Sequence, residues 1–394
     1  MTPFDMPRPG LPRHGLLREI TDQAVIDTVL ARGQVTRSEL AELTGISKPT
    51  ISESARRLEG AGLLQATGVR SGFRGRVATY YELATQAGWV LAMDIDSEGV
   101  HTRCADLSGV VFDEHHHPPG PQGDTGAVVR SIRAATRRSI KKGDRTHGRL
   151  RALAMSVSNA VDPATSRILV LPSASFPEGK LDPSTVLADL VTAPILVDND
   201  INCAALAEHR AGAAVGEDSF AYLFVGSGFG MGLYSNGRMI RGAHGLAGEV
   251  SYLATATGPA EYSTLVSALG QQGFGTPDSN ALDVPTIRRS LAGGRTEDKE
   301  AARAAAKAAR TLGTAIGQII IATCAVVDPD LVLVGGPLGR HPALFERARR
   351  TVADLFPSPV RIELGAIGET ASLQGALHLA LDHSRRNLLK SASA

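Results

Sequence analysis

The sequence of 394 residues predicts an N-terminal winged helix-turn-helix followed by a larger α/β domain. Two short helical patterns joined through Gly45 precede a β-hairpin pattern with an arginine-rich tip, which is the order of a winged helix. From Trp89 onward, apolar strands alternate with helices, as in an α/β domain. Within that domain, one strand ends in Asn199-Asp200 and the next in a glycine turn, which indicates a site suited to a polyol and a phosphate.

Composition limits the functional classes. The apolar fraction of 43% and the charged fraction of 21% are ordinary for a globular protein, and the net charge of +1 means that any nucleic acid must meet a local basic patch. Cys104, Cys203 and Cys324 are scattered, which suits a reducing compartment. Residues 1–18 lack a continuous apolar run and are predicted to be a disordered arm, not a signal peptide. The run 316–327 is too short to span a bilayer, so we expect a cytoplasmic protein without a membrane partner.

Residues 19–83 are predicted to form a DNA-binding domain. Thr36 and Glu39 have the spacing of a capping box for a first helix that ends at Gly45. Ser47 can cap a second helix, with Pro49 in its first turn. That helix turns its apolar residues inward. We expect contacts to base edges or phosphates from its outward-facing side chains, Lys48, Thr50, Ser52, Glu53 and Arg56.

The following hairpin is predicted to be the wing. Strand patterns begin at Leu64 and at Ala78, and the tip between them carries Arg70, Arg74 and Arg76 without any acidic residue. Arginines on such a tip suit the narrow minor groove, where the negative potential is deepest. A helix pair alone is more often an ordinary αα-hairpin, and a basic tip alone is more often a solvated loop. Their combination in this order favours a DNA-binding winged helix.

Residues 88–383 are predicted to be one α/β domain of two lobes, followed by a disordered tail at 384–394. The expected strands are 89–96, 100–106, 110–112, 153–158, 195–197, 331–334 and 360–364, and the expected helices are 126–142, 183–191, 261–269, 296–327 and 371–381. The helix 126–142 is basic on its outer face. The run from His115 to His117 could be a metal tract, but three adjacent side chains on an exposed turn cannot all face one ion, which favours a solvated loop.

Several motifs occur together in this domain. They are Asp198-Asn199-Asp200 with 204–208, the glycine turn 226–232, Asn236-Gly237-Arg238, Ala247-Gly248-Glu249 and Leu333-Val334-Gly335-Gly336. With a winged helix in front, this order resembles the ROK family (repressors, open reading frames and kinases) over residues 20–382. The resemblance implies two actin-like, sugar-kinase-type lobes with a ligand cleft between them.

The resemblance also implies roles for individual residues. The residue matching Asn199 binds a sugar hydroxyl, and the one matching Asp200 is the base that deprotonates the attacking hydroxyl. Glu249 and Glu261 match two further sugar ligands, and Tyr252 occupies the position of a family histidine. Each carboxylate taken alone is more often a surface charge or a helix cap.

Three departures from the family pattern argue against catalysis. The kinases carry Asp-x-Gly-Gly-Thr at the first strand turn, whereas this chain has Asp94-Ile95-Asp96-Ser97-Glu98, whose side chains block the backbone from phosphate. The carboxylates at this turn should also reject the phosphates of ATP, because two like charges about 4 Å apart repel by roughly 4 kcal/mol at an effective dielectric of about 20. Tyr252 replaces the histidine, and residues 254–260 contain none of the cysteines of the family's zinc segment. We therefore expect no enzyme activity, no cofactor and no metal.

The sequence thus predicts a transcriptional regulator of carbohydrate-related genes, most simply a repressor. It would bind a double-stranded operator as a homodimer or tetramer, with two half-sites about one helical turn apart. A sugar effector in the cleft would change lobe closure and so the spacing of the winged helices. Two alternatives stay open: an active ATP-dependent sugar kinase with a DNA-binding domain, and a regulator that has lost small-molecule binding.

Overall fold

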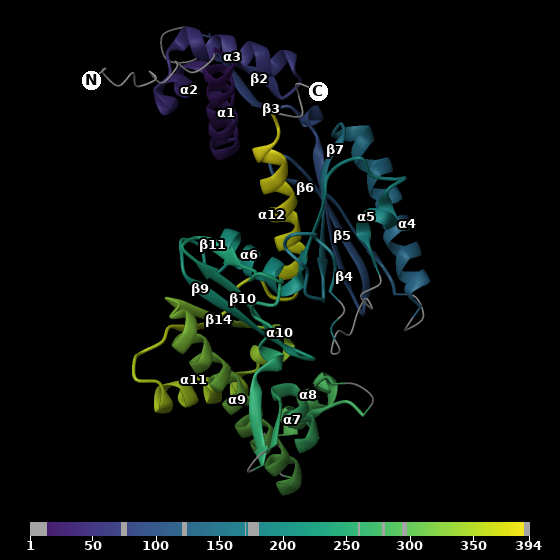
Figure 1. The fold of residues 1–394 in the computed structure, drawn as a ribbon. Coiled ribbons are helices and arrows are strands. Elements are labelled where there is room, and N and C mark those ends of the chain that lie inside the picture. The colour runs from purple at the N-terminus through teal and green to yellow at the C-terminus, as the bar shows by residue number, and fades with distance from the viewer. Residues whose placement is uncertain are drawn as a thin grey trace, which may run out of the picture.

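Figure 1 shows a winged helix at one end of the molecule and two α/β lobes beyond it, with helix α12 passing between these parts. The computed structural model describes residues 14–71, 77–119, 124–169, 171, 181–258, 261–277, 280–293 and 298–389. The C-terminal end of the described chain lies beside the winged helix, so the last helix spans the distance from the lobes to the DNA-binding domain (Figure 1).

The winged helix has the predicted elements. These are α1 (His14–Arg32), β1 (Val35–Thr36), α2 (Arg37–Thr44), α3 (Lys48–Gly60), β2 (Leu64–Ser71) and β3 (Val77–Leu83), with strand order β1-β3-β2. The capping box is present, because the Thr36 hydroxyl accepts from the N–H of Glu39 and the Glu39 carboxylate accepts from the N–H of Thr36 at 2.7 Å. Gly45 ends α2 at φ +69°, a left-handed conformation that glycine adopts without a Cβ clash.

Both predicted termini of the folded part are corrected. Helix α1 begins at His14, so residues 14–18 are helical and do not belong to the arm. Helix α12 (Ala371–Arg386) continues beyond the predicted tail boundary, where Ser384 is 4% exposed and Leu388 only 1%. Leu388 packs into a core with residues of the winged helix and the first lobe, and these distant partners are not visible in the local sequence.

The first lobe contains a five-stranded sheet in the order β6-β5-β4-β7-β8. Its strands are β4 (Trp89–Asp96), β5 (Gly99–Asp106), β6 (Val111–His117), β7 (Leu150–Val157) and β8 (Ile195–Asn199). Strands β4, β7 and β8 are parallel, whereas β5 and β6 are antiparallel to their neighbours. Helices α4 (Thr125–Thr146) and α5 (Pro183–Leu187) cover one face. The three histidines lie in β6, not on a turn, so alternate side chains point to opposite faces.

The second lobe repeats the same topology, with strand order β11-β10-β9-β14-β15. Its strands are β9 (Phe220–Val225), β10 (Phe229–Ser235), β11 (Arg238–Ile240), β14 (Leu331–Gly335) and β15 (Ile362–Leu364). In both lobes the first three strands form an antiparallel meander and the last two join in parallel. This repetition confirms the predicted pair of α/β lobes.

The remaining elements complete the second lobe and the connection between lobes. They are η1 (Thr85–Ala87), α6 (Asp200–Ala211), η2 (Val250–Tyr252), β12 (Ala254–Gly258), β13 (Glu261–Thr264), α7 (Leu265–Leu269), η3 (Gly270–Phe274), α8 (Val284–Ala292), α9 (Lys299–Val327), α10 (Gly336–Gly339), α11 (Pro342–Leu355) and η5 (Gly368–Thr370). The predicted helix 261–269 is wrong in its first half, which is strand β13. The pairing of β13 with β12 outweighs the local pattern there.

One continuous apolar core joins the winged helix to the first lobe. Ile26, Leu40 and Ile51 of the winged helix belong to the same cluster as Val90 of β4 and Leu388. Since α12 packs against both α6 and β4, it forms the central support of this cluster. The winged helix is therefore packed on the first lobe and on α12, rather than tethered by the short linker alone.

Helix α9 is the one helix in the described part of the chain whose length and composition would allow it to cross a membrane. Half of its most apolar window is buried. Ile316, Ile319 and Ile320 lie in the core of the second lobe with residues of β14 and α11. This packing accounts for its apolar composition.

Candidate ligand cleft and DNA-binding surface

Helix α3, the second helix of the helix-turn-helix, presents the predicted polar face. Ile51, Ser54, Ala55 and Leu58 of α3 are buried. Of the outward-facing residues, Lys48, Thr50, Glu53 and Arg56 are exposed and Ser52 is half-buried. These five residues therefore line the solvent side of α3, as the sequence predicts.

Two contacts hold this helix on the domain and were not predicted. Arg57 pairs with Asp22 of α1 at 2.8 Å and with Glu53 at 3.1 Å. The buried Ser54 hydroxyl donates to the same Asp22 carboxylate. Glu53 is therefore partly neutralised by its own helix, whereas Lys48 and Arg56 have no hydrogen bond or ion pair to the described residues. The free cations, rather than Glu53, are the groups suited to phosphate or base contacts.

The wing is an antiparallel hairpin in which Arg70 pairs with Ala78 in the backbone register. Arg74 and Arg76, and the side chain of Arg70, lie outside the described residues. Their contacts with the minor groove stay a prediction. Arg37 of α2 stacks over the Tyr81 ring of β3, which ties the wing strand to the helix pair.

Asn199 and Asp200 stand where β8 of the first lobe passes into α6. Asn199 is the N-cap of that helix, and its Oδ1 accepts from the N–H groups of Ile201 and Asn202 at 2.9 and 3.2 Å. Its Nδ2 donates to Asn159 O and to Asp200 Oδ1. Every donor and acceptor of the Asn199 amide is thus engaged within the protein. A sugar hydroxyl would have to displace one of these bonds, so the cap function and the predicted ligand function compete.

Asp200 lies in an acidic environment. Burial raises the pKa of its carboxyl to about 7, and the nearby charges of Asp94 and Glu249 act in the same direction. The Ser158 hydroxyl and the Ile201 N–H oppose the shift by hydrogen bonding to the carboxylate. Burial also raises the pKa of Asp94 and that of Glu249. The structure therefore brings together Asn199, Asp200 and Glu249, with Asp94 as a further carboxyl.

Beside this cluster of carboxyls, an ion pair links the two lobes. Arg241, which follows β11 in the second lobe, donates to Asp198 Oδ2 of β8 from Nη2 at 2.5 Å and from Nε at 3.0 Å. Asp198 is 5% exposed and also accepts from Asn202 Nδ2. Burial disfavours the Arg241 charge, but the bonds to Asp198 outweigh it and the pKa of Arg241 is raised. Sequence reasoning named Asp198 only as part of a motif and missed Arg241, which lies three residues past Asn236-Gly237-Arg238.

A side chain closes the turn between β4 and β5, where the resemblance to the family predicts a phosphate-binding turn. Asp96 Oδ1 accepts from the backbone N–H of Glu98 at 2.8 Å and from that of Gly99 at 3.1 Å. Asp96 and Gly99 are paired across the tight hairpin between β4 and β5. The amides that could have bound an oxyanion are therefore already bound to a carboxylate of the chain itself.

The glycines of the 226–232 turn have a packing role. A Cβ on Gly230 would lie 2.0 Å from the Ile201 side chain, and one on Gly232 would lie 2.5 Å from the Ala205 side chain. These two glycines allow β10 to approach α6 closely. Gly248, at φ +90°, lies against the Met231 carbonyl and brings Glu249 to the cleft.

The remaining predicted ligand residues lie on the segment after Glu249. Tyr252 is 37% exposed in η2, and the Ser251 hydroxyl, which donates to Phe229 O at 2.7 Å, fixes this turn to β10. Glu261 begins β13, and its side chain lies outside the described residues. Of the stretch expected to match the zinc segment, the described residues 254–258 form β12, which pairs with β13. No group of three or more His, Cys, Asp or Glu side chains in the described ranges is arranged to hold a metal ion.

Helix α12 connects the group of carboxyls around Asp200 to the winged helix. At its first turn, the Ser372 hydroxyl donates to Asp94 Oδ2 at 2.5 Å. Further along, Gly375 packs so closely on α6 that a Cβ there would lie 1.7 Å from the Cys203 carbonyl oxygen. At its far end Leu388 lies in the core shared with the winged helix. Helix α12 and the residues that follow it therefore connect the Ser372–Asp94 hydrogen bond to the core of the winged helix.

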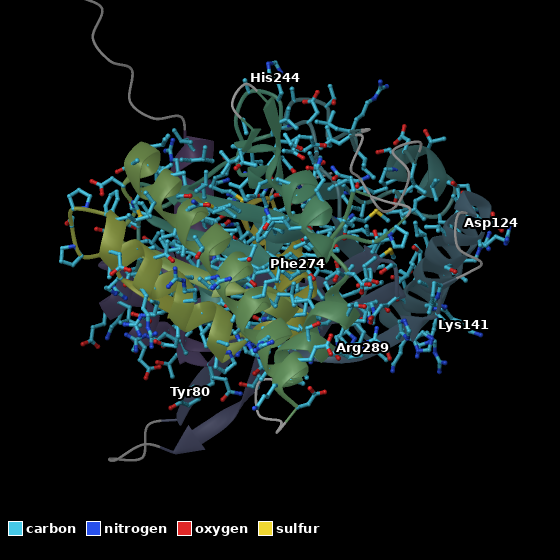
Figure 2. All side chains as sticks on the ribbon, turned by 90° about the horizontal axis from the view of Figure 1, so that it is seen from below. Tyr80, Asp124, Lys141, His244, Phe274 and Arg289 are labelled. Atoms are coloured by element: carbon cyan, nitrogen blue, oxygen red, sulfur yellow. The ribbon has the colours of Figure 1, made fainter. Side chains whose placement is uncertain are left out.

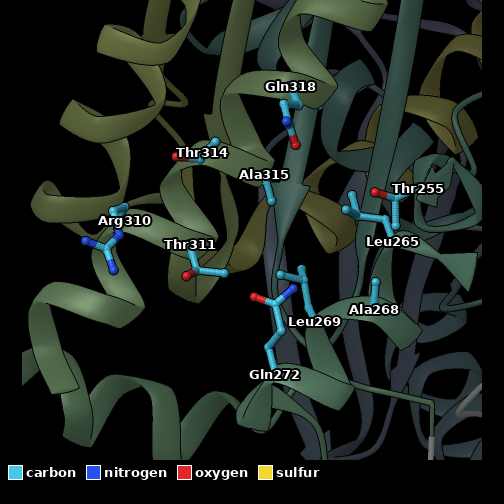
Figure 3. Close-up of a pocket in the computed structure, with 10 residues that line it drawn as sticks. All are labelled: Thr255, Leu265, Ala268, Leu269, Gln272, Arg310, Thr311, Thr314, Ala315 and Gln318. Atoms are coloured by element: carbon cyan, nitrogen blue, oxygen red, sulfur yellow. The ribbon is translucent and has the colours of Figure 1, made fainter. Parts of the chain in front are cut away.

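A separate hollow of about 290 Å³ lies in the second lobe between α9 and the α7 region (Figure 3). Arg310, Thr311 and Thr314 of α9 face Gln272 and Leu269 across it. None of Asn199, Asp200, Glu249 or Asp94 lines it, so it is separate from the group of residues around Asp200.

These features define a class: a winged helix-turn-helix protein with a duplicated sugar-kinase-like domain. Comparisons with known proteins agree. The profile described as "ROK family" matches residues 91–261, and that described as "Winged helix-turn-helix DNA-binding" matches residues 18–65. The chain therefore contains a region that matches the ROK family behind an N-terminal region that matches a winged helix-turn-helix.

The relatives of this chain include both a transcriptional repressor and an enzyme. A xylose repressor from Caldicellulosiruptor bescii is 23% identical over 61% of this chain and 59% of its own length. The bifunctional enzyme NanE/NanK from Brucella melitensis is 33% identical over 44% of this chain and 33% of its own length. The chain thus matches about three fifths of the repressor and a third of the enzyme. A crystal structure of a ROK family transcriptional regulator, a homologue of the Escherichia coli MLC protein, superimposes with a TM-score of 0.69 over 95% of this chain and 98% of that one, at 18% identity.

Proposed function

We propose that this protein is a sequence-specific DNA-binding transcriptional regulator, a repressor of carbohydrate-related genes that responds to a sugar or sugar derivative. The observation that carries the proposal is the continuous packing from Asp94 in the cleft, along α12, to Leu388 in the core of the winged helix. The xylose repressor among its relatives supports the same reading. The protein would act in the cytoplasm as a homodimer or tetramer on a palindromic operator.

We further infer that the cleft does not transfer phosphate. Asp96 occupies the backbone amides of the first hairpin, so an incoming phosphate would have to displace a carboxylate that is covalently part of the site. Asp200 has the raised pKa of a general base and stands at the position that the family resemblance assigns to one. The site would therefore keep a base for the sugar that accepts phosphate, but not the free backbone amides that would bind the phosphate donor. The chemistry that stays possible is recognition of a polyol by Asp200, Glu249 and neighbouring polar groups.

The DNA-binding part is tested with a duplex that the full-length protein itself enriches from a random-sequence library. We expect Arg56→Ala to weaken binding by roughly 10-fold or more, as for loss of a base or phosphate contact. Arg303→Ala, an exposed arginine on α9 in the far lobe, is the matched control and should bind as wild type does. Failure of the wild-type protein to enrich any sequence would refute the DNA-binding proposal.

The effector part is tested by titrating the protein–DNA complex with xylose, glucose, N-acetylglucosamine and N-acetylmannosamine. We expect one compound class to dissociate the complex in the wild-type protein and not in Asp200→Asn. An Asp200-dependent release of ADP in the presence of ATP would contradict the inference that the cleft is inactive. Silence with every sugar would favour a regulator that has lost small-molecule binding.

A further inference from the structure

Helix α4 carries a dense row of cations that neither the winged helix nor the cleft explains. Its basic residues are Arg130, Arg133, Arg137, Arg138, Lys141, Lys142 and Arg145, and its acidic residue is Asp144. The apolar residues of the same helix, such as Val128 and Ile132, are buried against the first sheet. One face is therefore fixed in the core and the opposite face is charged.

The cations divide into a paired and an unpaired set. Arg130 pairs with Asp124, Arg133 with Asp189, and both Arg138 and Lys142 with the buried Asp113. The unpaired set is Arg137, Lys141 and Arg145, which are exposed and make no hydrogen bond or ion pair with the described residues. We call these three residues the α4 row. Intrahelical spacing of four residues aligns them along one line of the helix.

The C-terminal end of the α4 row lies close to the linker that joins the winged helix to the first lobe. In Figure 2, which views the molecule from below, Tyr80 of strand β3 lies at the lower left and Lys141 at the right edge. The C-terminal end of α4 is also fastened to the domain linker, because Gln86 Nε2 donates to Thr146 O at 2.9 Å. Trp89 Nε1 donates to Asp144 Oδ1 nearby at 3.0 Å. Helix α4 therefore cannot move freely relative to the start of the first lobe.

We propose that the α4 row binds the phosphodiester backbone of duplex DNA that flanks the half-site held by the winged helix. This inference rests on the proposed DNA-binding function and adds a second, sequence-independent contact to it. The row runs over residues 137–145, a rise of about 12 Å along the helix, which equals three to four phosphate steps of one strand at about 3.4 Å of axial rise each. Exposed guanidinium and ammonium groups that make no hydrogen bond or ion pair with the described residues are suited to neutralise such a row of phosphates, although Arg137 is close enough to Asp189 to help lower the pKa of that carboxyl.

An anionic membrane surface is the other obvious polyanion, and α4 does not fit it. Membrane-surface helices insert an apolar face below their cations. The apolar face of α4 is occupied by the sheet, and no large hydrophobic residue of α4 is exposed. The observations therefore favour DNA, to which the winged helix already brings the chain.

The test compares two triple variants of the full-length protein. One is Arg137→Gln/Lys141→Gln/Arg145→Gln in the α4 row. The matched control is Lys299→Gln/Arg303→Gln/Arg310→Gln, which removes the same charge from exposed positions of α9 at the other end of the molecule. Fluorescence anisotropy measures binding to the self-selected duplex, either trimmed to its protected core or extended by about 15 base pairs on each side, roughly one and a half helical turns.

We expect the α4 variant to bind the extended duplex with a salt dependence reduced in slope by about 2.7 per protomer, or 0.9 for each of three phosphates. Binding to the trimmed core and binding by the α9 control should match the wild-type protein. Equal slopes for all three proteins on the extended duplex would overturn the inference while leaving the proposed function intact. If the wild-type protein selects no duplex at all, the proposed function fails and the α4 contact fails with it.

Discussion

Replacement of Asp200 by asparagine should stabilise the folded protein, and the gain should depend on pH. The Asp200 carboxyl has a pKa of about 7 in the folded state against an ordinary value of 3.8, chiefly because of burial, and the charges of Asp94 and Glu249 act in the same direction. At about 1.4 kcal/mol for each tenfold change in proton affinity, this difference corresponds to as much as about 4 kcal/mol. Asparagine keeps an oxygen to accept from the Ile201 N–H and the Asn199 amide, so the local bonds survive the change.

The sign follows from proton binding. Below about pH 4 the carboxyl is protonated in both the folded and the unfolded state, and it costs no stability. As the pH rises from about 4 toward 7, the unfolded state loses the proton first, and wild-type stability falls until the folded carboxyl is also ionised. We therefore expect Asp200→Asn to be close to wild type near pH 4 and more stable by a few kcal/mol near pH 8.

Urea unfolding at both pH values measures this difference. Asp189→Asn is a control of opposite sign, because hydrogen bonding to Arg133 lowers the pKa of Asp189 to about 2. The charge of Asp189 stabilises the fold above about pH 4, and this contribution is lost as the pH falls toward 2. An Asp200→Asn protein whose stability differs from wild type by the same amount at both pH values would refute the assignment of a buried, raised carboxyl.

Three further changes test the contacts that hold the cleft and α12. Arg241→Ala should destabilise the protein by about 3 kcal/mol because it leaves the buried Asp198 charge unpaired, and adding Asp198→Asn should restore much of this in a double-mutant cycle. Gly375→Ala should cost at least 1–3 kcal/mol, since its Cβ would meet the Cys203 carbonyl oxygen, whereas Gly60→Ala, with open space around it, should stabilise by about 0.5–1 kcal/mol in thermal unfolding. Leu388→Ala should cost about 2–5 kcal/mol and uncouple DNA binding from the effector, so an unchanged response to the effector would argue against transmission through α12.

Local chemistry made the winged helix predictable. The Thr36–Glu39 box, the Gly45 turn and the Ser47 cap each act within a few residues, so the sequence contains the complete interaction. The exposed face of α3 followed from helical periodicity for the same reason. The alternation of strands and helices likewise predicted two α/β lobes, although β13 was mistaken for helix.

The sequence by itself determined the kind of domains, their order and the residue types at the strand ends, because each depends on neighbours along the chain. Only the tertiary structure decided what those residues do. The side-chain amide of Asn199 makes all its hydrogen bonds to Asn159, Asp200 and the α6 backbone, and Asn159 lies 40 residues away in the sequence. Arg241 reaches Asp198 across 43 residues, and Ser372 reaches Asp94 across 278. Burial and long-range charge are sums over such distant partners, and no local pattern contains them.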